Sequence, residues 1–355
     1  MMSTIPATYR KIRVINMSAL SFAQQTEIVE VPIEQPGPGE VLIKVAFSGV
    51  EASDILQNRG FYGALAGRAP ESDANGKVQA GDCGCEGAGT VAAVGEGVEL
   101  EVGATVLLIG YGISYREYLT CPANQVIPVS VPPSPEMAAI PISAATAAGA
   151  LDISGRMSEG EQVLVTGAAG GTGQFAVQWA KAKYNARVVG ICGSAEKAQM
   201  LREIGCDETI NYKDESDMAA AISSRFPNGI DVAYESICGS LRDAVWANMG
   251  LFGRMICIGS VGDDYESTDA FVGHMIPSNS GLMKSLTCTS FFMFNLLGDP
   301  RLQQIITEIM GYIQQGRIIA RVDPASASFK GLEGVYEAQK YIRTGQNAGK
   351  ICVSL

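Results

Sequence analysis

The sequence predicts an α/β fold in which a barrel-like domain of short β-strands is joined to a doubly wound parallel β-sheet. In about the first 135 residues, short β-favouring runs alternate with turns rich in glycine and proline. From residue 138 onward, strand patterns alternate with helical patterns, which is the arrangement that places helices on both faces of a parallel sheet. The length of 355 residues also favours two domains, because a domain commonly contains about 100–200 residues.

The barrel-like part contains three well-defined strand patterns. They are expected at residues 40–47, after the turn 35–39, and at 87–95 and 104–109. Between Gly63 and Asp82 the sequence is polar, rich in glycine, alanine and aspartate, and without periodicity. We expect this segment to form a long surface loop.

The second part contains the alternating elements. Helices are expected at 138–151, 175–180, 195–204, 301–314 and 330–341. Strands are expected at 162–166, 187–191, 208–212, 230–234, 253–258, 285–292, 318–322 and 350–354. Strands that alternate with helices in this way predict a parallel sheet covered on both faces.

Composition and charge exclude several classes of function. The chain carries 26 Lys and Arg residues against 37 Asp and Glu, for a net charge of −11, and it has no block of basic residues. Nucleic-acid binding depends on clustered Lys and Arg that displace counterions, so no nucleic-acid partner is expected. His274 is the single histidine, so a zinc site built from two or three imidazoles is excluded. We expect His274 to lie at the surface.

The cysteines and the apolar segments indicate a reducing, cytoplasmic environment. The N-terminus lacks the apolar core of a signal peptide, and the longest uncharged stretch, residues 137–151, is too short to span a bilayer. We therefore expect a cytoplasmic protein with no membrane partner. The nine cysteines are scattered, several of them within apolar runs, and we expect them to be reduced and buried.

A glycine-rich motif, T-G-A-A-G-G-T-G at residues 166–173, lies between a predicted strand and a predicted helix. The pyrophosphate of a dinucleotide must approach the backbone N–H groups at such a helix start, and side chains there would block it. Gly170, Gly171 and Gly173 leave that space open. The motif is shifted from the usual G-x-G-x-x-G, so a tight entry into the helix is the alternative interpretation.

The end of the next predicted strand indicates which nicotinamide cofactor binds. An Asp or Glu at that point would bind the ribose hydroxyls of NAD and repel a 2′-phosphate. Here the strand ends in G-I-C-G-S at residues 190–194, without a carboxylate, and Lys197 follows one helical turn later. The pattern favours NADP(H), with an ordinary solvated lysine as the alternative role for Lys197. Its neighbour Glu196 is expected to face solvent.

Several motifs occur in the order found in a known superfamily. They are G-V-E-A-S-D-I at 49–55, G-C-E-G-A-G at 84–89, the strand and glycine loop at 163–176, G-C-D-E-T-I-N-Y-K at 205–213, D-V-A-Y-E-S at 231–236 and N-A-G-K at 347–350. Over nearly its whole length the chain resembles the medium-chain dehydrogenase/reductase superfamily, and within it the zinc-independent quinone oxidoreductase branch.

The resemblance implies a GroES-like β-barrel catalytic domain, residues 1–137 and 316–355, and a Rossmann NADP(H)-binding domain, residues 138–315. It also implies a homodimer in which the sixth strands pair. The implied cofactor-binding residues are Ala169, Gly170, Gly171, Thr172 and Gly173 at the pyrophosphate, Ser194, Lys197 and Tyr212 at the 2′-phosphate and adenosine, Ser236, Ile258, Gly259, Ser260, Phe291 and Phe292 along the nicotinamide half, and Asn347 near the phosphates.

The zinc-dependent members of this superfamily place a cysteine and a histidine ligand in two of these motifs. The matching residues here are Glu51 and Cys85, and the third ligand position falls near Ile142 or Ser143. Neither isoleucine nor serine suits zinc, so we expect no catalytic metal.

Without zinc, the chemistry best suited to this resemblance is hydride addition to a C=C bond that a neighbouring carbonyl already polarises. The expected activity is therefore the NADPH-dependent reduction of an α,β-unsaturated ketone, such as a 15-keto-prostaglandin. Reduction of a quinone by NADPH is an alternative. An alternative of another class is an NADPH-binding structural or interaction protein.

Three residues are candidates for the catalytic site. Tyr62 matches a tyrosine near the family active site and could donate a hydrogen bond to the enolate oxygen, or it could pack in the pocket wall. Ser53 stands where zinc enzymes keep a proton-relay serine, but we favour a role for its hydroxyl in capping a short helix. Glu51 departs from the asparagine of the close relatives. Beside NADPH this carboxyl would be ion-paired or have a raised pKa, and it would disfavour acidic substrates.

Overall fold

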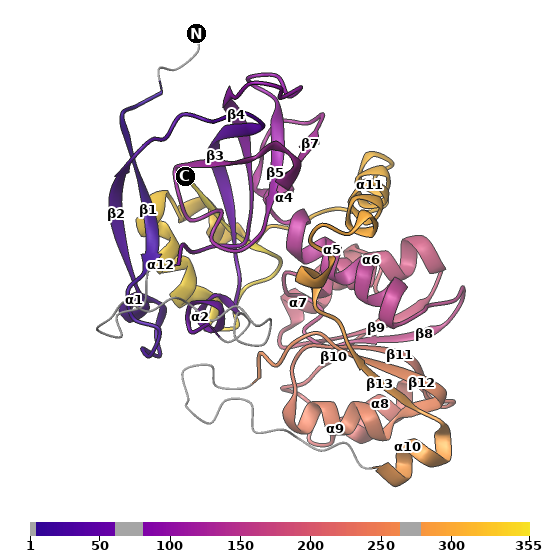
Figure 1. Cartoon of the computed structure of the whole chain (residues 1–355). Coiled ribbons are helices and arrows are strands. Elements are labelled where there is room, and N and C mark those ends of the chain that lie inside the picture. The colour runs from indigo at the N-terminus through magenta and orange to yellow at the C-terminus, as the bar shows by residue number, and fades with distance from the viewer. Residues whose placement is uncertain (1–4, 61–80, 263–277) are drawn as a thin grey trace. The chain divides into compact units, whose positions relative to one another are not determined.

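The computed structural model describes residues 5–60, 81–262 and 278–355. The chain forms two compact units (Figure 1). The first, here called the antiparallel unit, comprises residues 1–141 and 322–355, and the second, here called the parallel unit, comprises residues 142–321.

The parallel unit is built on a six-stranded sheet in which every neighbouring pair of strands is parallel. The strands are β8 (Gln162–Val165), β9 (Arg187–Cys192), β10 (Glu208–Asn211), β11 (Ile230–Glu235), β12 (Met249–Cys257) and β13 (Thr287–Ser290). Their spatial order is β10-β9-β8-β11-β12-β13, which is the order of the doubly wound dinucleotide-binding fold. The prediction of a doubly wound parallel sheet is confirmed, and β13 is the core of the strand predicted at 285–292.

Helices cover both faces of this sheet. They are α6 (Gly173–Tyr184), α7 (Ala195–Glu203), α8 (Met218–Arg225), α9 (Gly239–Ala247), α10 (Ser278–Lys284) and α11 (Pro300–Gln314). Helices α8 and α9 pack on one face over a buried cluster that includes Leu164, Val189 and Trp246, and α6 and α7 lie on the other face (Figure 1). This alternation brings the carboxyl ends of all six strands to one edge of the sheet, where the connecting loops can bind a ligand.

A long apolar helical stretch extends the helix predicted at 138–151. Its segments are α4 (Pro135–Ala138), the π-helical turn η2 (Ile140–Ala144), α5 (Ala145–Gly149) and the π-helical turn η3 (Ala150–Ser154). In the described part of the chain, Pro135–Ser154 is the one helix long and apolar enough to cross a membrane, but 83% of its apolar window is buried inside the protein. Such burial is typical of a core helix.

The strand predicted at 318–322 is wrong, because in the described structure only its last residue, Val322, pairs with another segment, through an isolated parallel bridge to Lys350. Two glutamines of α6 take the place of a neighbouring strand. The Gln178 side chain donates to the carbonyl of Ile319 at 2.9 Å and accepts from its N–H at 2.7 Å. The Gln174 side chain bonds the carbonyl and the N–H of Arg321 in the same way, at 2.8 and 2.7 Å. Amide side chains thus satisfy backbone groups that a neighbouring strand would bond in a sheet.

The antiparallel unit contains a six-stranded antiparallel sheet and a hairpin. The sheet strands are β3 (Glu40–Val50), β4 (Glu86–Val94), β5 (Thr105–Ile109), β6 (Tyr118–Pro122), β7 (Val126–Val129) and β14 (Ile351–Ser354), and the hairpin strands are β1 (Thr8–Val14) and β2 (Thr26–Pro32). The order is β14-β3-β4-β5-β7, with β6 also paired to β3. The strands predicted at 40–47, 87–95 and 104–109 are confirmed as β3, β4 and β5, and the C-terminal strand joins them in one sheet.

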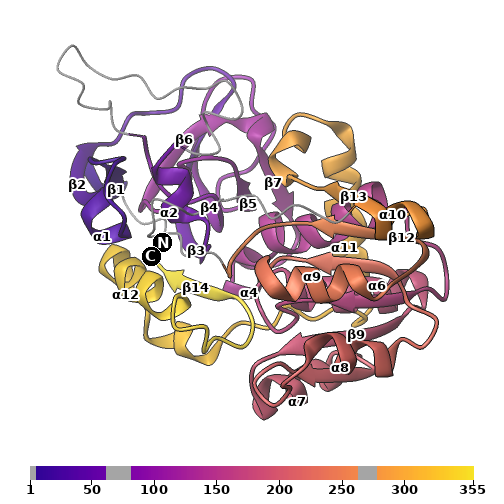
Figure 2. The same ribbon diagram turned by 90° about the horizontal axis from the view of Figure 1, so that it is seen from below.

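Short helices complete the two units. In the antiparallel unit they are α1 (Phe22–Gln25), α2 (Asp54–Asn58), α12 (Gly331–Ile342) and the 3-10 turns η1 (Ala123–Gln125) and η5 (Pro324–Ser328), and in the parallel unit the 3-10 turn η4 (Met293–Leu296). Helix α12 packs beside β14 (Figure 2) and buries Leu332 and Val335 in a cluster with Val50 and Ile351. This packing fixes the adjoining ends of β3 and β14, where charged side chains meet.

Candidate functional site

The glycine loop of the parallel unit follows β8 and leads into α6 at the carboxyl edge of the sheet. Gly167 has a φ of +56°, and a Cβ at Gly173 would lie 2.8 Å from the Cα of Ala168, so neither position accepts a side chain without a backbone shift. The N–H of Gly170 bonds the carbonyl of Gly167 at 2.9 Å and closes the turn. Thr172 stands at the N-cap position of α6 without a side-chain cap. The N–H groups of Gln174, Phe175 and Ala176 already bond the carbonyls of Gly170 and Thr172 at 3.1–3.3 Å, so an anion such as a pyrophosphate would be bound by the N–H groups just before them, from Gly171 to Gly173.

Ser236 ties the carboxyl ends of β8 and β11 together beside this loop. Its N–H donates to Thr166 Oγ1 at 2.9 Å, and its hydroxyl donates to the Thr166 carbonyl at 3.3 Å. Its carbonyl accepts from the N–H of Val261 at 2.9 Å, which draws residues 258–260, after β12, to the same edge. The structure thus brings together Ser236 and the segment predicted to lie along the nicotinamide half of the cofactor.

A buried ion pair braces this edge. Glu235 ends β11 fully buried, and its Oε2 accepts from Arg242 Nε at 2.6 Å. Its other carboxylate oxygen accepts from the N–H groups of Ile237 and Cys238 at 2.7 and 2.8 Å. Arg242 also donates to the carbonyl of Gly259 at 3.1 Å, so the pair joins the loops that follow β11 and β12. Sequence analysis does not identify this pair, although a lone glutamate at the end of an apolar strand was a usable signal.

The predicted 2′-phosphate residues gather at the ends of β9 and β10. Ser194 caps α7, because its Oγ accepts from the N–H of Lys197 at 3.3 Å. The ring of Tyr212 lies over Gly193, where a Cβ would come within 2.7 Å of the ring. Glu196 is exposed, as predicted, and the bend between β9 and α7 carries no other carboxylate. A serine hydroxyl, a lysine and a half-exposed tyrosine suit a ribose that carries a phosphate.

The two phenylalanines predicted beside the nicotinamide follow β13. Phe291 is buried, and its ring lies over Gly149 of α5, where a Cβ would come within 2.6 Å of the ring. The Phe292 ring is half-buried and lies 5.5 Å from the ring of Phe294. Phe291 therefore has a packing role within the parallel unit, and the expected contact of both rings with the cofactor stays a prediction.

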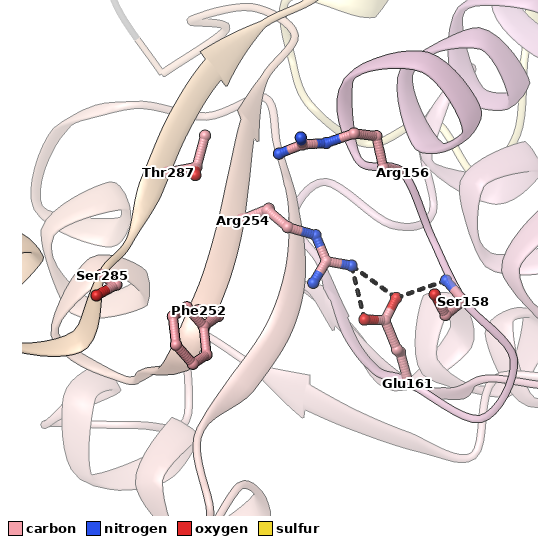
Figure 3. A pocket seen from close by; sticks show the side chains of 7 residues that line it. All are labelled: Arg156, Ser158, Glu161, Phe252, Arg254, Ser285 and Thr287. Carbon is pink, nitrogen blue, oxygen red and sulfur yellow. Dashed lines mark hydrogen bonds and ion pairs between the residues drawn. The ribbon is translucent and has the colours of Figure 1, made fainter.

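A separate pocket of about 380 Å³ opens at the amino-terminal edge of the same sheet (Figure 3). Its lining residues are Arg156, Ser158, Glu161, Phe252, Arg254, Ser285 and Thr287. Arg254 is fixed in its wall by two 2.7 Å bonds to Glu161 and by a 2.8 Å bond to the carbonyl of Gly155. Doubly wound sheets bind cofactors at the carboxyl ends of their strands, so this pocket is not the predicted cofactor site.

In the antiparallel unit, three charged side chains meet where β14, β3 and β4 lie side by side. Glu51 directly follows β3, Lys350 directly precedes β14, and Glu86 begins β4. The antiparallel register pairs Ile351 with Val50, which sets Lys350 opposite Glu51. The Lys350 ammonium bonds the Glu51 carboxylate and lies 2.5 Å from Glu86 Oε1. We call these three residues the acidic lysine cluster.

The acidic lysine cluster is shielded from solvent. The side chains of Lys350 and Glu86 are 1% and 0% exposed, whereas Glu51 is 15% exposed. A Cβ at Gly49 would lie 2.5 Å from Glu86 Oε1, so this glycine permits the close packing. Burial raises the pKa of Glu51 well above its usual range, Lys350 opposes that shift and Glu86 adds to it. Burial works against the charge of Lys350, but the two carboxylates outweigh it and raise the pKa of the ammonium. The cluster therefore favours a proton on Glu51 while Lys350 stays charged.

The residues at the zinc-ligand positions do not fit a zinc ion. Lys350 already places a positive charge on Glu51, and a second cation there would be repelled. Cys85 is fully buried, and burial raises the pKa of its thiol well above the ordinary value, which disfavours a thiolate ligand. Within residues 5–60, 81–262 and 278–355, no three His, Cys, Asp or Glu side chains are grouped so that they could hold a metal.

A second buried network adjoins Glu51 around Asp54. Asp54 Oδ2 accepts from the Tyr115 hydroxyl, from the N–H of Glu51 at 3.1 Å and from Gln339 Nε2 at 2.6 Å. Asp54 Oδ1 and Gln339 Oε1 are both buried, and neither has a hydrogen-bond partner among the described residues. Burial raises the pKa of Asp54 to about 6, although these hydrogen bonds act in the opposite direction. Sequence analysis names neither Tyr115 nor Gln339, because both are far from Asp54 in the chain.

The helix-capping role favoured for Ser53 is wrong. Ser53 precedes α2 with helical backbone angles, φ −79° and ψ −6°, and its hydroxyl makes no cap hydrogen bond. The hydroxyl instead accepts from Gln57 Nε2 at 3.4 Å, and the same amide lies 3.6 Å from the sulfur of Cys85. A capping serine needs an extended backbone, which this position does not adopt. The proton-relay role of Ser53 stays a prediction.

Tyr62 and His274 lie outside the described residues, as do residues 63–80 of the loop predicted from Gly63 to Asp82. Asn347 belongs to the antiparallel unit, and its Nδ2 donates to the carbonyl of Gly349 at 3.0 Å. Its role near the cofactor phosphates stays a prediction.

The cysteines depart from the prediction at one place. All nine are free, and seven are buried as expected, but Cys288 is exposed and Cys257 is half-buried. Cys288 lies on β13, the last strand of the sheet, in which Cys288 and Ser290 are exposed. The prediction of burial is wrong there because an edge strand leaves part of its surface uncovered.

Two family descriptions match the chain. Residues 37–132 match the alcohol dehydrogenase GroES-like domain, and residues 171–310 match the zinc-binding dehydrogenase family. These segments lie within the antiparallel and the parallel unit, respectively.

Curated proteins are similar to the chain over almost its whole length. The chain is 36% identical over 362 residues to a probable quinone oxidoreductase of Leishmania amazonensis, with 99% of each chain covered. It is 35% identical over 365 residues to prostaglandin reductase-3 of Bos taurus, with 99% of this chain and 91% of that protein covered. Among solved structures, Escherichia coli quinone oxidoreductase complexed with NADPH matches with a TM-score of 0.79 and 21% identity, covering 98% of this chain and 100% of that one. The structural likeness bears on the fold.

Proposed function

The chain belongs to the quinone oxidoreductase branch of the medium-chain dehydrogenase/reductase superfamily, and on this premise we propose that it reduces the C=C bond of an α,β-unsaturated ketone with NADPH. NADPH, when bound, supplies the hydride for this reaction. The N–H groups at the start of α6 would hold its pyrophosphate. Ser194, Lys197 and Tyr212 would hold its 2′-phosphate.

The main support for this proposal is the largely buried, lysine-paired carboxyl of Glu51. After hydride addition to an enone, the resulting enolate needs a proton at its α-carbon. Glu51 holds a proton more tightly than an ordinary carboxyl, and part of its side chain is exposed. Lys350 stabilises the carboxylate that is left when the proton departs, so Glu51 can release the proton and regain it from solvent. We assign Glu51 as the proton donor.

Product analysis in D₂O tests the reaction. The protein is incubated with NADPH and 2-cyclohexenone, and the product is examined by NMR. We expect cyclohexanone with protium delivered to the β-carbon and solvent deuterium at the α-carbon. Formation of the allylic alcohol, or no turnover of a panel of enones, would contradict the proposal. An ortho-quinone is tested in parallel, because similarity to quinone oxidoreductases supports that second substrate class.

Glu51→Gln tests the proton donor. Loss of a general acid commonly costs about 10²-fold or more in rate, so we expect kcat to fall by about that factor. NADPH affinity should not change. The matched control is Glu101→Gln, which removes an exposed carboxylate from the turn before β5 and should leave kcat unaltered. An unchanged kcat in Glu51→Gln would exclude Glu51 as the donor.

Cofactor selection is tested by titrating the protein with NADPH and NADH. We expect NADPH to bind much more tightly. Lys197→Ala should weaken NADPH binding about tenfold and leave NADH binding unchanged, because only NADPH carries the 2′-phosphate. Equal affinities of the unaltered protein for both cofactors would contradict the role of Ser194, Lys197 and Tyr212.

We further propose a homodimer that pairs the β13 edges of two chains. Among the described strands β13 ends the sheet order, and its outer edge can pair with another strand. Large apolar side chains are exposed nearby, at the start of β12 and on α10. They are Leu251 (65%), Phe252 (64%), Leu282 (78%) and Met283 (81%). Light scattering should give a dimer for the unaltered chain and a monomer for Leu282→Glu/Met283→Glu, with Ile319→Glu as an exposed control that stays dimeric.

A further inference from the structure

Two thiols meet at the β13 edge of the parallel sheet. Cys257 ends β12 and Cys288 lies on β13, and their sulfur atoms are 3.8 Å apart, within hydrogen-bonding distance for sulfur. Cys288 is exposed, whereas Cys257 is half-buried. The buried neighbours of Cys257 are those that pack under α8 and α9, so it lies on that face of the sheet. Pairing of β13 with another strand would use its backbone edge and leave the two faces of the strand free.

The register of the two strands opposes a disulfide between these thiols. Cys288 pairs with Met255, and Cys257 pairs with Ser290, so the two cysteines are offset by two residues along parallel strands. With strands about 4.8 Å apart and a rise of about 3.3 Å per residue, this offset separates the two Cα atoms by about 8 Å. A disulfide spans Cα atoms that are about 4.4–6.8 Å apart, so closure requires the backbone to move. The pair therefore persists as two thiols.

The pKa values of the two thiols are shifted in opposite directions. The hydrogen bond from Cys257 is the largest cause that lowers the pKa of Cys288, to about 7; burial opposes it, and the guanidinium of Arg242 adds to the fall. The same hydrogen bond raises the pKa of Cys257. The geometry allows either sulfur to donate, and the greater exposure of Cys288 favours a thiolate there, solvated by water, with Cys257 as the S–H donor. One carboxylate, Glu235, and one cation, Arg242, also act on the two thiols, but Glu235 is already bonded to Arg242 and to two backbone N–H groups.

We propose that Cys288, with Cys257 as its hydrogen-bond donor, is a modification site for soft carbon electrophiles of the α,β-unsaturated carbonyl and quinone class. The Cys288 sulfur forms a bond to the β-carbon of the electrophile, and the electron pair of the C=C bond moves to the carbonyl oxygen as an enolate. Water then protonates the α-carbon, so no oxidant or reductant is consumed. The site shares its electrophile class with the proposed substrate but uses none of the cofactor residues or Glu51.

The expected gain in rate follows from two opposing effects. At pH 7 a thiol of pKa about 7 is half ionised, whereas one of ordinary pKa about 9 is about 1% ionised, which favours Cys288 about fiftyfold. A thiolate of lower pKa is less nucleophilic, with a Brønsted slope of about 0.45, and two units cost about eightfold. The net advantage supplied by Cys257 is about sixfold at pH 7.

The test uses N-ethylmaleimide, a simple Michael acceptor, on the full chain without NADPH, with labelled peptides quantified by mass spectrometry from pH 6 to 9.5. We expect Cys288 to react at least tenfold faster than any other cysteine, with a midpoint near pH 7. Cys257→Ala should slow labelling about sixfold at pH 7 and move the midpoint toward pH 9. Cys257→Ser retains a hydrogen-bond donor and should keep the midpoint low.

Ser290→Ala is the matched control, because it removes an exposed hydroxyl from the same strand opposite Cys257 and should not change the rate or the midpoint. Labelling of Cys288 no faster than that of the buried cysteines would overturn the proposal, as would a midpoint that Cys257→Ala leaves unmoved. So would recovery of Cys257 and Cys288 joined as a disulfide in protein kept without reductant. Labelling is measured without turnover, so failure of the proposed reduction leaves this result independent.

Discussion

Replacement of Asp54 by asparagine should stabilise the protein at neutral pH, although it replaces a carboxylate that accepts three hydrogen bonds. Asp54 is 2% exposed, and burial raises the pKa of its carboxyl from an ordinary value of 3.8 to about 6. The folded state therefore binds this proton more tightly than the unfolded chain does. The contribution of Asp54 to stability falls as pH rises from about 4 to about 6 and stays low above that range.

The magnitude follows from the shift. Two pKa units correspond to about 3 kcal/mol, which is the greatest gain available from removing the charge at pH 7.5. An amide oxygen in place of Oδ2 still accepts from Tyr115 and Gln339, but these bonds lose the strengthening that a charged acceptor gives. The amide nitrogen supplies a donor at the position of Oδ1, in a network where Gln339 Oε1 has no partner within the part of the chain that the structure describes. We expect Asp54→Asn to gain about 1–2 kcal/mol at pH 7.5.

Urea unfolding followed by circular dichroism at pH 4.5 and pH 7.5 measures this effect. The gain of Asp54→Asn over the unaltered protein should be larger at pH 7.5 than at pH 4.5, where the aspartate is already mostly protonated. Asp243→Asn, at an exposed position on α9, is the control and should show no such difference. A loss of stability in Asp54→Asn at pH 7.5 would refute the reasoning, since it would show that the hydrogen bonds of the carboxylate outweigh its desolvation.

Three further substitutions test other parts of the structure. Gly49→Ala would set a Cβ within 2.5 Å of Glu86 Oε1, so the melting temperature should fall by several degrees through a loss of about 2 kcal/mol. Gln178→Leu removes the 2.7 and 2.9 Å hydrogen bonds between the Gln178 side chain and the N–H and carbonyl of Ile319. Hydrogen exchange at the Ile319 amide should therefore accelerate at least tenfold. Gly173→Ala would crowd the Cα of Ala168 at the entry to α6, and NADPH affinity measured by fluorescence titration should fall at least tenfold while the fold is retained.

The sequence predicts the parallel sheet well because its information is local. Each strand and helix from 162 to 257 has its own apolar pattern, and the glycine-rich motif between β8 and α6 is recognisable from neighbouring residues alone. The hydrogen bonding of segment 318–322 was not predictable, because its backbone bonds Gln174 and Gln178, 147 and 141 residues away. Long-range side-chain bonds of this kind leave no periodic trace in the sequence.

At the candidate site, too, the sequence predicts a local feature but not its long-range partner. The sequence marks Glu51 as unusual and predicts that its carboxyl is paired or has a raised pKa. The structure pairs it with Lys350, and burial favours a raised pKa. The partner lies 299 residues away at the start of β14, so only the strand register reveals it. A usable signal was nevertheless present, because Lys350 and Glu86 are charged residues that each border a buried apolar strand. Charged side chains that are buried at such positions are stabilised when they pair with an opposite charge.

The acidic lysine cluster also explains why Glu51 can be altered to study chemistry while Lys350 cannot. Glu51→Gln removes one of two carboxylates and leaves Lys350 paired with Glu86 at 2.5 Å, so no buried charge is stranded. Lys350→Met leaves Glu51 and Glu86 together without a cation, and breaking a buried pair in this way commonly costs about 3–5 kcal/mol. Thermal unfolding should therefore show Glu51→Gln close to the unaltered protein and Lys350→Met strongly destabilised. If both variants are equally unstable, the loss of turnover in Glu51→Gln reports on folding, and the proton-donor assignment loses its support.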